Sequence, residues 1–104
     1  MSDEAKSGHG AEVRRRILEM GLTLWRVDPQ YVTSRRIASE IGLSHSAVLY
    51  HFQTAALLRD AIAFYAVKNG DSRVIVSLIS MRHPSVETMP DDARVQHMRL
   101  CGAR

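Results

Sequence analysis

Residues 44–51 carry the side chains of this chain that are best suited to chemistry. Hydroxyl, imidazole and phenol groups flank three apolar residues there, and the segment holds no acidic residue. Such groups donate and accept hydrogen bonds at base edges, and a short helix that carries them suits insertion into the major groove of DNA. The exposed side of this helix is expected to present His45, Ser46, Leu49, Tyr50 and His51.

The two histidines also raise the question of a metal site. His45 and His51 are six residues apart in sequence, which places them on different helical faces, whereas helical zinc pairs are spaced i, i+4. The single cysteine, Cys101, leaves no cysteine-rich metal site and no intramolecular disulfide. The chain shows no nucleophile–base pair, paired carboxylates or phosphate-binding loop. The sequence therefore predicts no metal, no cofactor and no enzymatic activity.

Two short helices around a glycine turn are expected to position these groups. Thr33 can cap the first helix, and Gly42 can end it in the left-handed conformation without a Cβ penalty. Ser44 can cap the second helix. The helical spacing predicts inward positions at Ile37, Ala38, Ile41, Leu43, Ala47, Val48 and Phe52.

Helical periodicity extends over most of the remaining chain, so the predicted fold class is all-α. A β-branched run at residues 74–76 makes a strand conceivable there, but no partner strand is evident. Asp28-Pro29 should end the first helix, Asn69-Gly70 the fourth, and Pro90 should open the last. The further helices are expected at residues 11–27, 54–69, 73–82 and from Pro90 to about Leu100.

Composition and length are those of one small globular domain with an appendage. The 104 residues are 45% hydrophobic, and the net charge of +3 with a pI near 9.5 points toward an anionic partner. We expect a flexible N-terminal segment at 1–10, a helical DNA-binding domain at 11–70 and a short helical extension at 71–104. No apolar run could span a bilayer and the N-terminus lacks a signal-peptide core, so no membrane partner and a cytoplasmic location are expected.

Residues 14–62 resemble the DNA-binding domain of the TetR family of bacterial transcriptional regulators. The family pattern has a first helix ending in an aromatic residue, a Thr-x-Arg-x-Ile-Ala segment, a glycine turn, an aromatic-rich recognition helix and a later leucine. These features appear here in order as Leu24-Trp25, Thr33-Ser-Arg-Arg-Ile-Ala38, Gly42-Leu43-Ser44, Val48-Leu-Tyr-His-Phe52 and Leu58. The resemblance implies a TetR/homeodomain-like helix-turn-helix domain, followed here by one or two short C-terminal helices.

The resemblance also assigns roles to individual residues on double-stranded DNA. It directs His45, Ser46, Ala47 and Leu49 toward base edges, and it places Arg35 where its guanidinium can reach a guanine. Phosphate contacts fall to Thr33, Tyr50 and His51. With Ser44, these residues make up the predicted DNA-binding set. The run Arg14-Arg15-Arg16 either touches the flanking backbone of the DNA or is a solvated helix face.

The sequence departs from the family pattern in ways that affect function. Ala55 stands where the family usually has a phosphate-binding lysine, and Leu49 where an aromatic residue often touches DNA. About 34 residues follow Gly70, too few to enclose an ordinary inducer pocket. No small-molecule inducer is therefore expected.

The segment after Gly70 is the predicted dimerisation element. Its stripe of Val74, Ile75, Leu78 and Ile79 is expected at a dimer interface, which Met81, Val95, Met98 and Leu100 could extend; alternatively the segment packs on helices of its own chain. The functional prediction is a homodimeric regulator on a palindromic operator, acting as a repressor, with activation left open. The alternative is a helical interaction module, an adaptor or anti-repressor, that kept the fold without DNA binding; Ala55 and Leu49 fit that reading.

Overall fold

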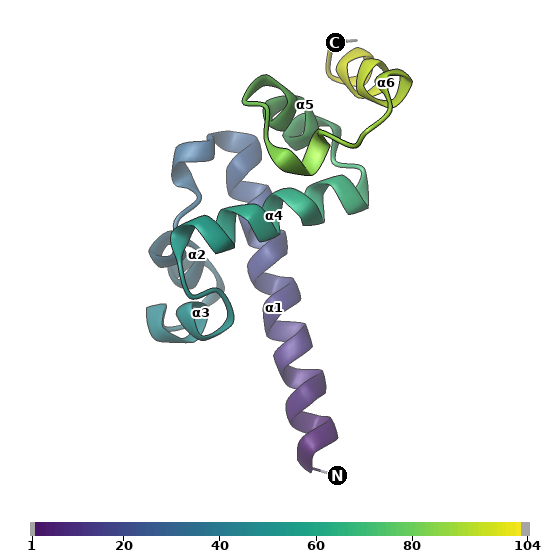
Figure 1. Ribbon diagram of the computed structural model, residues 1–104. Coiled ribbons are helices and arrows are strands. Elements are labelled where there is room, and N and C mark those ends of the chain that lie inside the picture. Colours follow the sequence, from purple (N-terminus) through teal and green to yellow (C-terminus); the bar gives the residue numbers. More distant parts are fainter. Residues whose placement is uncertain (1, 103–104) are drawn as a thin grey trace. The chain divides into compact units, whose positions relative to one another are not determined.

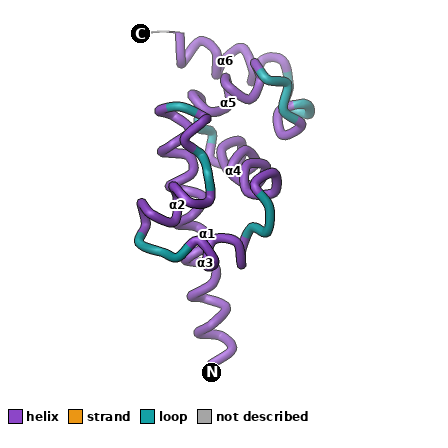
Figure 2. The backbone as a smooth tube through the Cα atoms, turned by 90° about the vertical axis from the view of Figure 1, so that its left-hand side faces the viewer, coloured by secondary structure: helices purple, strands orange, loops and turns teal. Residues whose placement is uncertain are grey.

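The computed structural model describes residues 2–102, and these are mostly helical, with no β-strand among them (Figures 1 and 2). The all-α prediction is thereby confirmed. The six α-helices and two 3-10 turns of the described chain are α1 Ser2–Val27, η1 Pro29–Tyr31, α2 Ser34–Ile41, α3 His45–His51, α4 Ala55–Asn69, α5 Ser72–Ser80, η2 Pro84–Val86 and α6 Asp91–Gly102.

The chain divides into two compact units, an N-terminal unit, Met1–Arg59, and a C-terminal unit, Asp60–Arg104. The division falls within α4, whereas the sequence suggested a boundary after that helix, at Gly70. Helix α4 runs unbroken to Asn69, and its residues from Asp60 onward belong to the same unit as α5 and α6.

Helix α1 is longer than its sequence pattern predicted. It begins at Ser2 instead of Ala11, so the segment expected as a lead-in is helical from its second residue. No proline lies in this segment, and its glycines each cost a helix only about 1 kcal/mol relative to alanine. The predicted stop is confirmed: α1 ends at Val27, and the Asp28 carboxylate caps η1 by accepting a hydrogen bond from Gln30 N at 2.9 Å.

Helices α2 and α3 form where the sequence predicted them and are joined by a three-residue turn (Figure 1). Thr33 Oγ1 caps α2 by accepting from Arg36 N at 3.0 Å, and Ser44 Oγ caps α3 by accepting from Ala47 N at 3.1 Å. Gly42 ends α2 at φ 73°, in the left-handed region that favours glycine.

The core of the N-terminal unit joins α1 to the two short helices. Helix α2 packs against both α1 and α3. As predicted, Ile37, Ala38, Val48 and Phe52 are buried, while Ile41, Leu43 and Ala47 are half-buried. The other buried apolar residues of this unit are Val13, Ile17, Leu18, Leu22, Leu24, Trp25, Val32 and Leu58.

In the C-terminal unit, the segment that allowed either helix or strand is helix α5, and Asp71 caps it. Its apolar stripe faces inward: Val74, Ile75 and Leu78 are each 0% exposed, and α5 packs against α6 and η2. Burial within the chain therefore speaks against a dimer interface at these three residues, whereas Ile79, the fourth residue of the predicted stripe, is half-buried. These three side chains instead pack within their own chain, which was the alternative. Their surface is already removed from water there.

Helix α5 ends in a turn that the sequence did not reveal. Arg82 has φ 55°, a left-handed conformation that is uncommon for a residue with a side chain, and His83 N donates to Leu78 O at 2.9 Å to close the turn. The turn η2 follows, and Pro84 opens it.

Candidate nucleic-acid interface

Helix α3 presents two exposed polar side chains on one face. Ser46 and Tyr50 are four residues apart, which places them one turn from each other, and Tyr50 is 79% exposed. Ala47 and Leu49 are half-buried beside them. The helix contains no acidic residue, so its exposed face carries hydrogen-bonding groups and no negative charge.

The two histidines of α3 are less exposed than predicted. His45 is half-buried, and its Nε2 lies 2.7 Å from the hydroxyl of Ser34 at the start of α2. One ring nitrogen therefore links the two helices, and only Nδ1 remains for another partner. His51 closes α3; its ring lies edge-on to that of Tyr50, with 5.3 Å between centroids.

Thr33 and Ser44 occupy equivalent places at the starts of α2 and α3. Both are exposed, and each hydroxyl oxygen already accepts a hydrogen bond from a backbone N–H of its own helix. Each hydroxyl keeps its own proton to donate, and a phosphate oxygen is a suitable acceptor. The capping role and the predicted phosphate role are thus compatible.

Neighbouring arginines of α2 differ in what holds them. The Arg36 guanidinium lies 3.0 Å from the Glu40 carboxylate and 5.6 Å from the ring centroid of Tyr31. Arg35 is exposed, and no hydrogen bond or ion pair joins its guanidinium to another residue of the described chain. Of these two, Arg35 is the one whose charge and five donors are available to a ligand.

The arginine run of α1 has structural partners. Arg14 Nη1 donates to His51 O at the end of α3 at 3.4 Å, and its guanidinium carbon lies 4.4 Å from the ring centroid of Phe52. Arg16 Nη2 donates to Ile41 O at the end of α2 at 3.2 Å. Cations are favoured at helix C-termini, where backbone carbonyls lack partners. The two arginines therefore tie α1 to the ends of both short helices.

The middle arginine of the run is neutralised on α1 itself. The Arg15 guanidinium contacts the carboxylates of Glu12 at 2.6 Å and Glu19 at 2.9 Å. The hydrogen bonds to Glu12 and then Glu19 raise the pKa of Arg15 above its ordinary value. The sequence allowed this run either to touch the DNA backbone or to be a solvated helix face, and Arg15 fits the solvated face. The hydrogen bonds of Arg14 and Arg16 to other helices correspond to neither alternative.

Arg59 is a further structural cation that the sequence pattern did not reveal. Its Nη1 donates to Pro29 O at 3.1 Å and to Val32 O at 3.2 Å, and its guanidinium carbon lies 4.9 Å from the ring centroid of Trp25. It thereby holds the turn between α1 and α2. Nothing in its spacing along α4 signals this role, because its partners are about 30 residues away.

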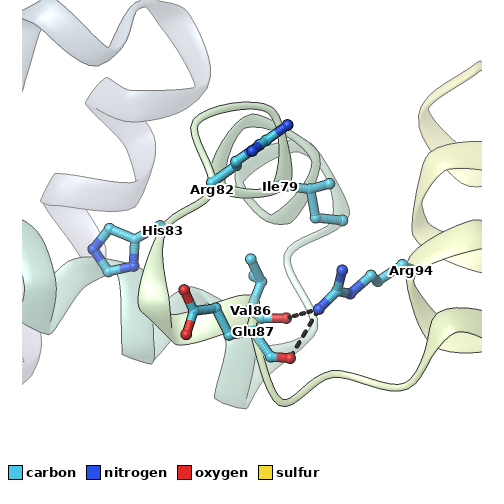
Figure 3. A pocket seen from close by; sticks show the side chains of 6 residues that line it. All are labelled: Ile79, Arg82, His83, Val86, Glu87 and Arg94. Carbon is cyan, nitrogen blue, oxygen red and sulfur yellow. Dashed lines mark hydrogen bonds between the residues drawn. The ribbon is translucent and has the colours of Figure 1, made fainter.

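The C-terminal unit contains a pocket of about 360 Å³ beside the end of α5 (Figure 3). Figure 3 shows the Arg94 side chain directed at the backbone of Val86 and Glu87, at the end of η2. Its Nη2 donates to Val86 O at 2.8 Å and to Glu87 O at 2.9 Å. Its Nε also donates to Met89 O at 3.1 Å. Arg94 therefore holds α6 against η2. The lining residues are Ile79, Arg82, His83, Val86, Glu87 and Arg94.

Three polar side chains form a hydrogen-bonded row next to this pocket. His83 Nδ1 accepts from Ser85 N at 3.0 Å, which places the imidazole proton on Nε2, where it donates to Asp60 Oδ1 at 2.9 Å. The Ser85 hydroxyl lies 2.8 Å from the same Nδ1, but Ser85 is buried. Since Nδ1 already accepts the backbone N–H and the hydroxyl is inaccessible, the row caps η2 and does not present a nucleophile.

The described part of the chain, residues 2–102, offers neither a membrane span nor a metal-binding cluster. No helix there is long and apolar enough to cross a membrane. No three side chains of histidine, cysteine, aspartate or glutamate gather there in a way that could hold a metal ion.

Comparison with known proteins does not assign the chain to a family. No family model matches it, and no curated protein or solved structure is significantly similar to it. The resemblance to the TetR family therefore stays a prediction.

Proposed function

We propose that this chain is a sequence-specific DNA-binding transcriptional regulator. In this proposal α2, the turn at Gly42 and α3 are a TetR/homeodomain-like helix-turn-helix, with α3 as the helix that enters the major groove of double-stranded DNA. The observation that carries it is the acid-free exposed face of α3, with Ser46 and Tyr50, next in the chain to a helix whose Arg35 has no partner in the described structure.

The side chains divide by what they can contact. Ser46 and the free nitrogen of His45 can hydrogen-bond to base edges, while Ala47 and Leu49 offer apolar surface to a thymine methyl. Arg35 can make a bidentate contact with guanine. The caps Thr33 and Ser44, with Tyr50 and His51, suit contacts to phosphate or sugar, which set register without reading sequence.

The ties from α1 support the same proposal through rigidity. Arg14 and Arg16 hold the C-terminal ends of α3 and α2, and the hydrogen bond of His45 to Ser34 joins their N-terminal parts. A reading surface must keep its side chains in fixed positions, because displacement by about 1 Å weakens hydrogen bonds of defined geometry.

A homodimer and repression complete the proposal. One helix-turn-helix covers a small interface, so useful specificity normally needs two half-sites read by a symmetric dimer. A dimer bound to a palindromic operator at a promoter would block transcription.

The proposal is tested by selecting bound sequences from a random DNA pool and measuring affinity for the selected site. Arg35→Ala should weaken binding by about 1–3 kcal/mol and relax the preference for one base pair, as expected for loss of a guanine contact. Arg36→Ala is the matched control, because Arg36 is the neighbouring exposed arginine but is paired with Glu40. Equal losses in the two variants would contradict the assigned role of Arg35.

Salt titration separates this function from that of an interaction module. A DNA-binding protein loses affinity steeply as salt rises, because cations compete for the phosphates that the protein neutralises. An adaptor or anti-repressor would show no selected sequence and little binding at any salt concentration, and that result would refute the proposal.

A further inference from the structure

Helix α6 has an unusual distribution of polar and apolar side chains. Two polar side chains anchor it: Arg94 donates to three backbone carbonyls near η2, and His97 Nδ1 lies 2.8 Å from the hydroxyl of Ser72. Ala93 and Cys101 are half-buried beside them. Its large apolar side chains point to solvent, with Val95 48% exposed, Met98 50% and Leu100 58%. Polar contacts thus hold the helix in place, while its apolar surface stays uncovered.

The exposed residues of α6 follow the spacing of a helix-pairing seam. Asp91, Val95 and Met98 are exposed and recur at steps of four and three, the alternation that keeps residues on one stripe of a helix. Val95 and Met98 form the centre of the stripe. Such a stripe commonly packs against a partner helix, and the charges beside it indicate which partner.

Those charges are complementary to the same helix in the opposite direction. Asp92 and Arg99 are both exposed and lie seven residues apart, on the same edge of the stripe. In an antiparallel pair that packs Val95 of each copy against Met98 of the other, Asp92 of each copy faces Arg99 of the other. A parallel pair would instead bring the acidic N-terminal ends together. A two-fold interface uses one surface patch twice, so it requires this self-complementarity.

We propose that α6 is the homodimerisation surface, pairing antiparallel with α6 of a second copy of this chain. The helix has 12 residues and is about 18 Å long, so one helix pair buries less than the roughly 1,600 Å² of a standard stable interface. The dimer is accordingly weak in free solution, and two half-sites on one DNA molecule strengthen it by raising the effective concentration. This inference rests on the homodimer of the proposed function, and the strengthening by DNA rests also on its DNA binding.

The apolar part of the surface is tested by sedimentation equilibrium of the full chain from micromolar to several hundred micromolar concentration. The unmodified chain should show a monomer–dimer equilibrium, and Val95→Glu or Met98→Glu should raise its dissociation constant by about tenfold or more, the equivalent of about 1.4 kcal/mol. Gln96→Glu is the control, because it adds the same charge at an exposed position of α6 outside the stripe; it should change the constant less than about twofold, or about 0.4 kcal/mol. A chain that is monomeric throughout, or equal effects of all three substitutions, would overturn the proposal.

The charged part is tested by mixing two variants. A chain with Asp92→Arg carries only positive charge at these two positions, and one with Arg99→Asp carries only negative charge. Each variant alone should associate more weakly than the unmodified chain, and an equimolar mixture should regain association as a heterodimer. Loss of helix structure alone could not be repaired by mixing, so failure of the mixture to associate would refute antiparallel pairing. Both tests measure mass without DNA, so their outcome is separate from that of the DNA-binding proposal.

Discussion

At the scale of single residues, the arginines of the N-terminal unit show how one side-chain type takes different roles. Arg14, Arg16 and Arg59 bind backbone carbonyls of distant segments, whereas Arg36 pairs with an acid one turn away. Arg35 makes neither kind of contact within the described chain. Long cationic side chains satisfy local or structural partners first, so the arginine without one is the strongest candidate for a ligand.

The ties from α1 predict unequal effects within one arginine run. Arg16→Ala should lower the free energy of unfolding by about 1 kcal/mol, because it leaves Ile41 O at the end of α2 without its donor. Arg15→Ala should change it much less than Arg16→Ala does, since exposed ion pairs contribute little. Urea denaturation measures both. Equal effects would mean that the bond from Arg16 does not stabilise the unit.

At the scale of elements, two helix ends use the left-handed conformation with different residues. Gly42 closes α2 at φ 73°, and a Cβ added there would meet no atom within 4 Å. Arg82 closes α5 at φ 55° despite its side chain. Alanine at Gly42 therefore reports backbone strain without a steric clash, and Arg82 already carries that strain.

Substitutions at these two ends should act in opposite directions. Gly42→Ala should destabilise the protein by about 1 kcal/mol, because alanine disfavours this conformation. Arg82→Gly removes backbone strain of about 1–2 kcal/mol from the folded state. Glycine also gives the unfolded chain more conformational entropy, which costs roughly 0.4–1 kcal/mol of stability, so the net effect should be neutral to slightly stabilising. Thermal unfolding of both variants checks this. Clear destabilisation by Arg82→Gly would show that the arginine side chain itself stabilises the turn.

At the scale of the whole molecule, the C-terminal unit, Asp60–Arg104, is a compact unit with buried residues of its own. Leu78 is 0% exposed in this unit, while Met98 lies on the outer side of α6 and is half exposed. The apolar residues of this segment thus belong to two surfaces, one already covered within the chain and one uncovered. Only the uncovered set is available for association.

Alanine substitution separates these two surfaces. Leu78→Ala should cost about 2–5 kcal/mol of stability, because it leaves a cavity in a packed core. Met98→Ala should cost less than about 1 kcal/mol at concentrations where the chain is monomeric. Denaturant unfolding at low protein concentration measures both. Similar costs for the two variants would contradict the separation.

The sequence by itself determined the helix ends and the chemistry of α3. The roles of Thr33, Gly42 and Ser44 at helix ends were predictable, because a cap or a left-handed residue acts on backbone groups within about four positions. The neighbouring sequence is therefore enough to indicate them. The absence of acids along α3 and the polar residues at both of its ends are likewise properties of the sequence.

Tertiary structure decided which of several similar side chains remain available. The pattern could not distinguish Arg35 from Arg16, because the partner of Arg16 lies 25 residues away at the end of another helix. Nor could it show that the stripe of α5 is buried while Val95 and Met98 on α6 are exposed, because both have helical spacing. Local signals fix where helices begin and end, whereas contacts between distant segments decide which faces are covered.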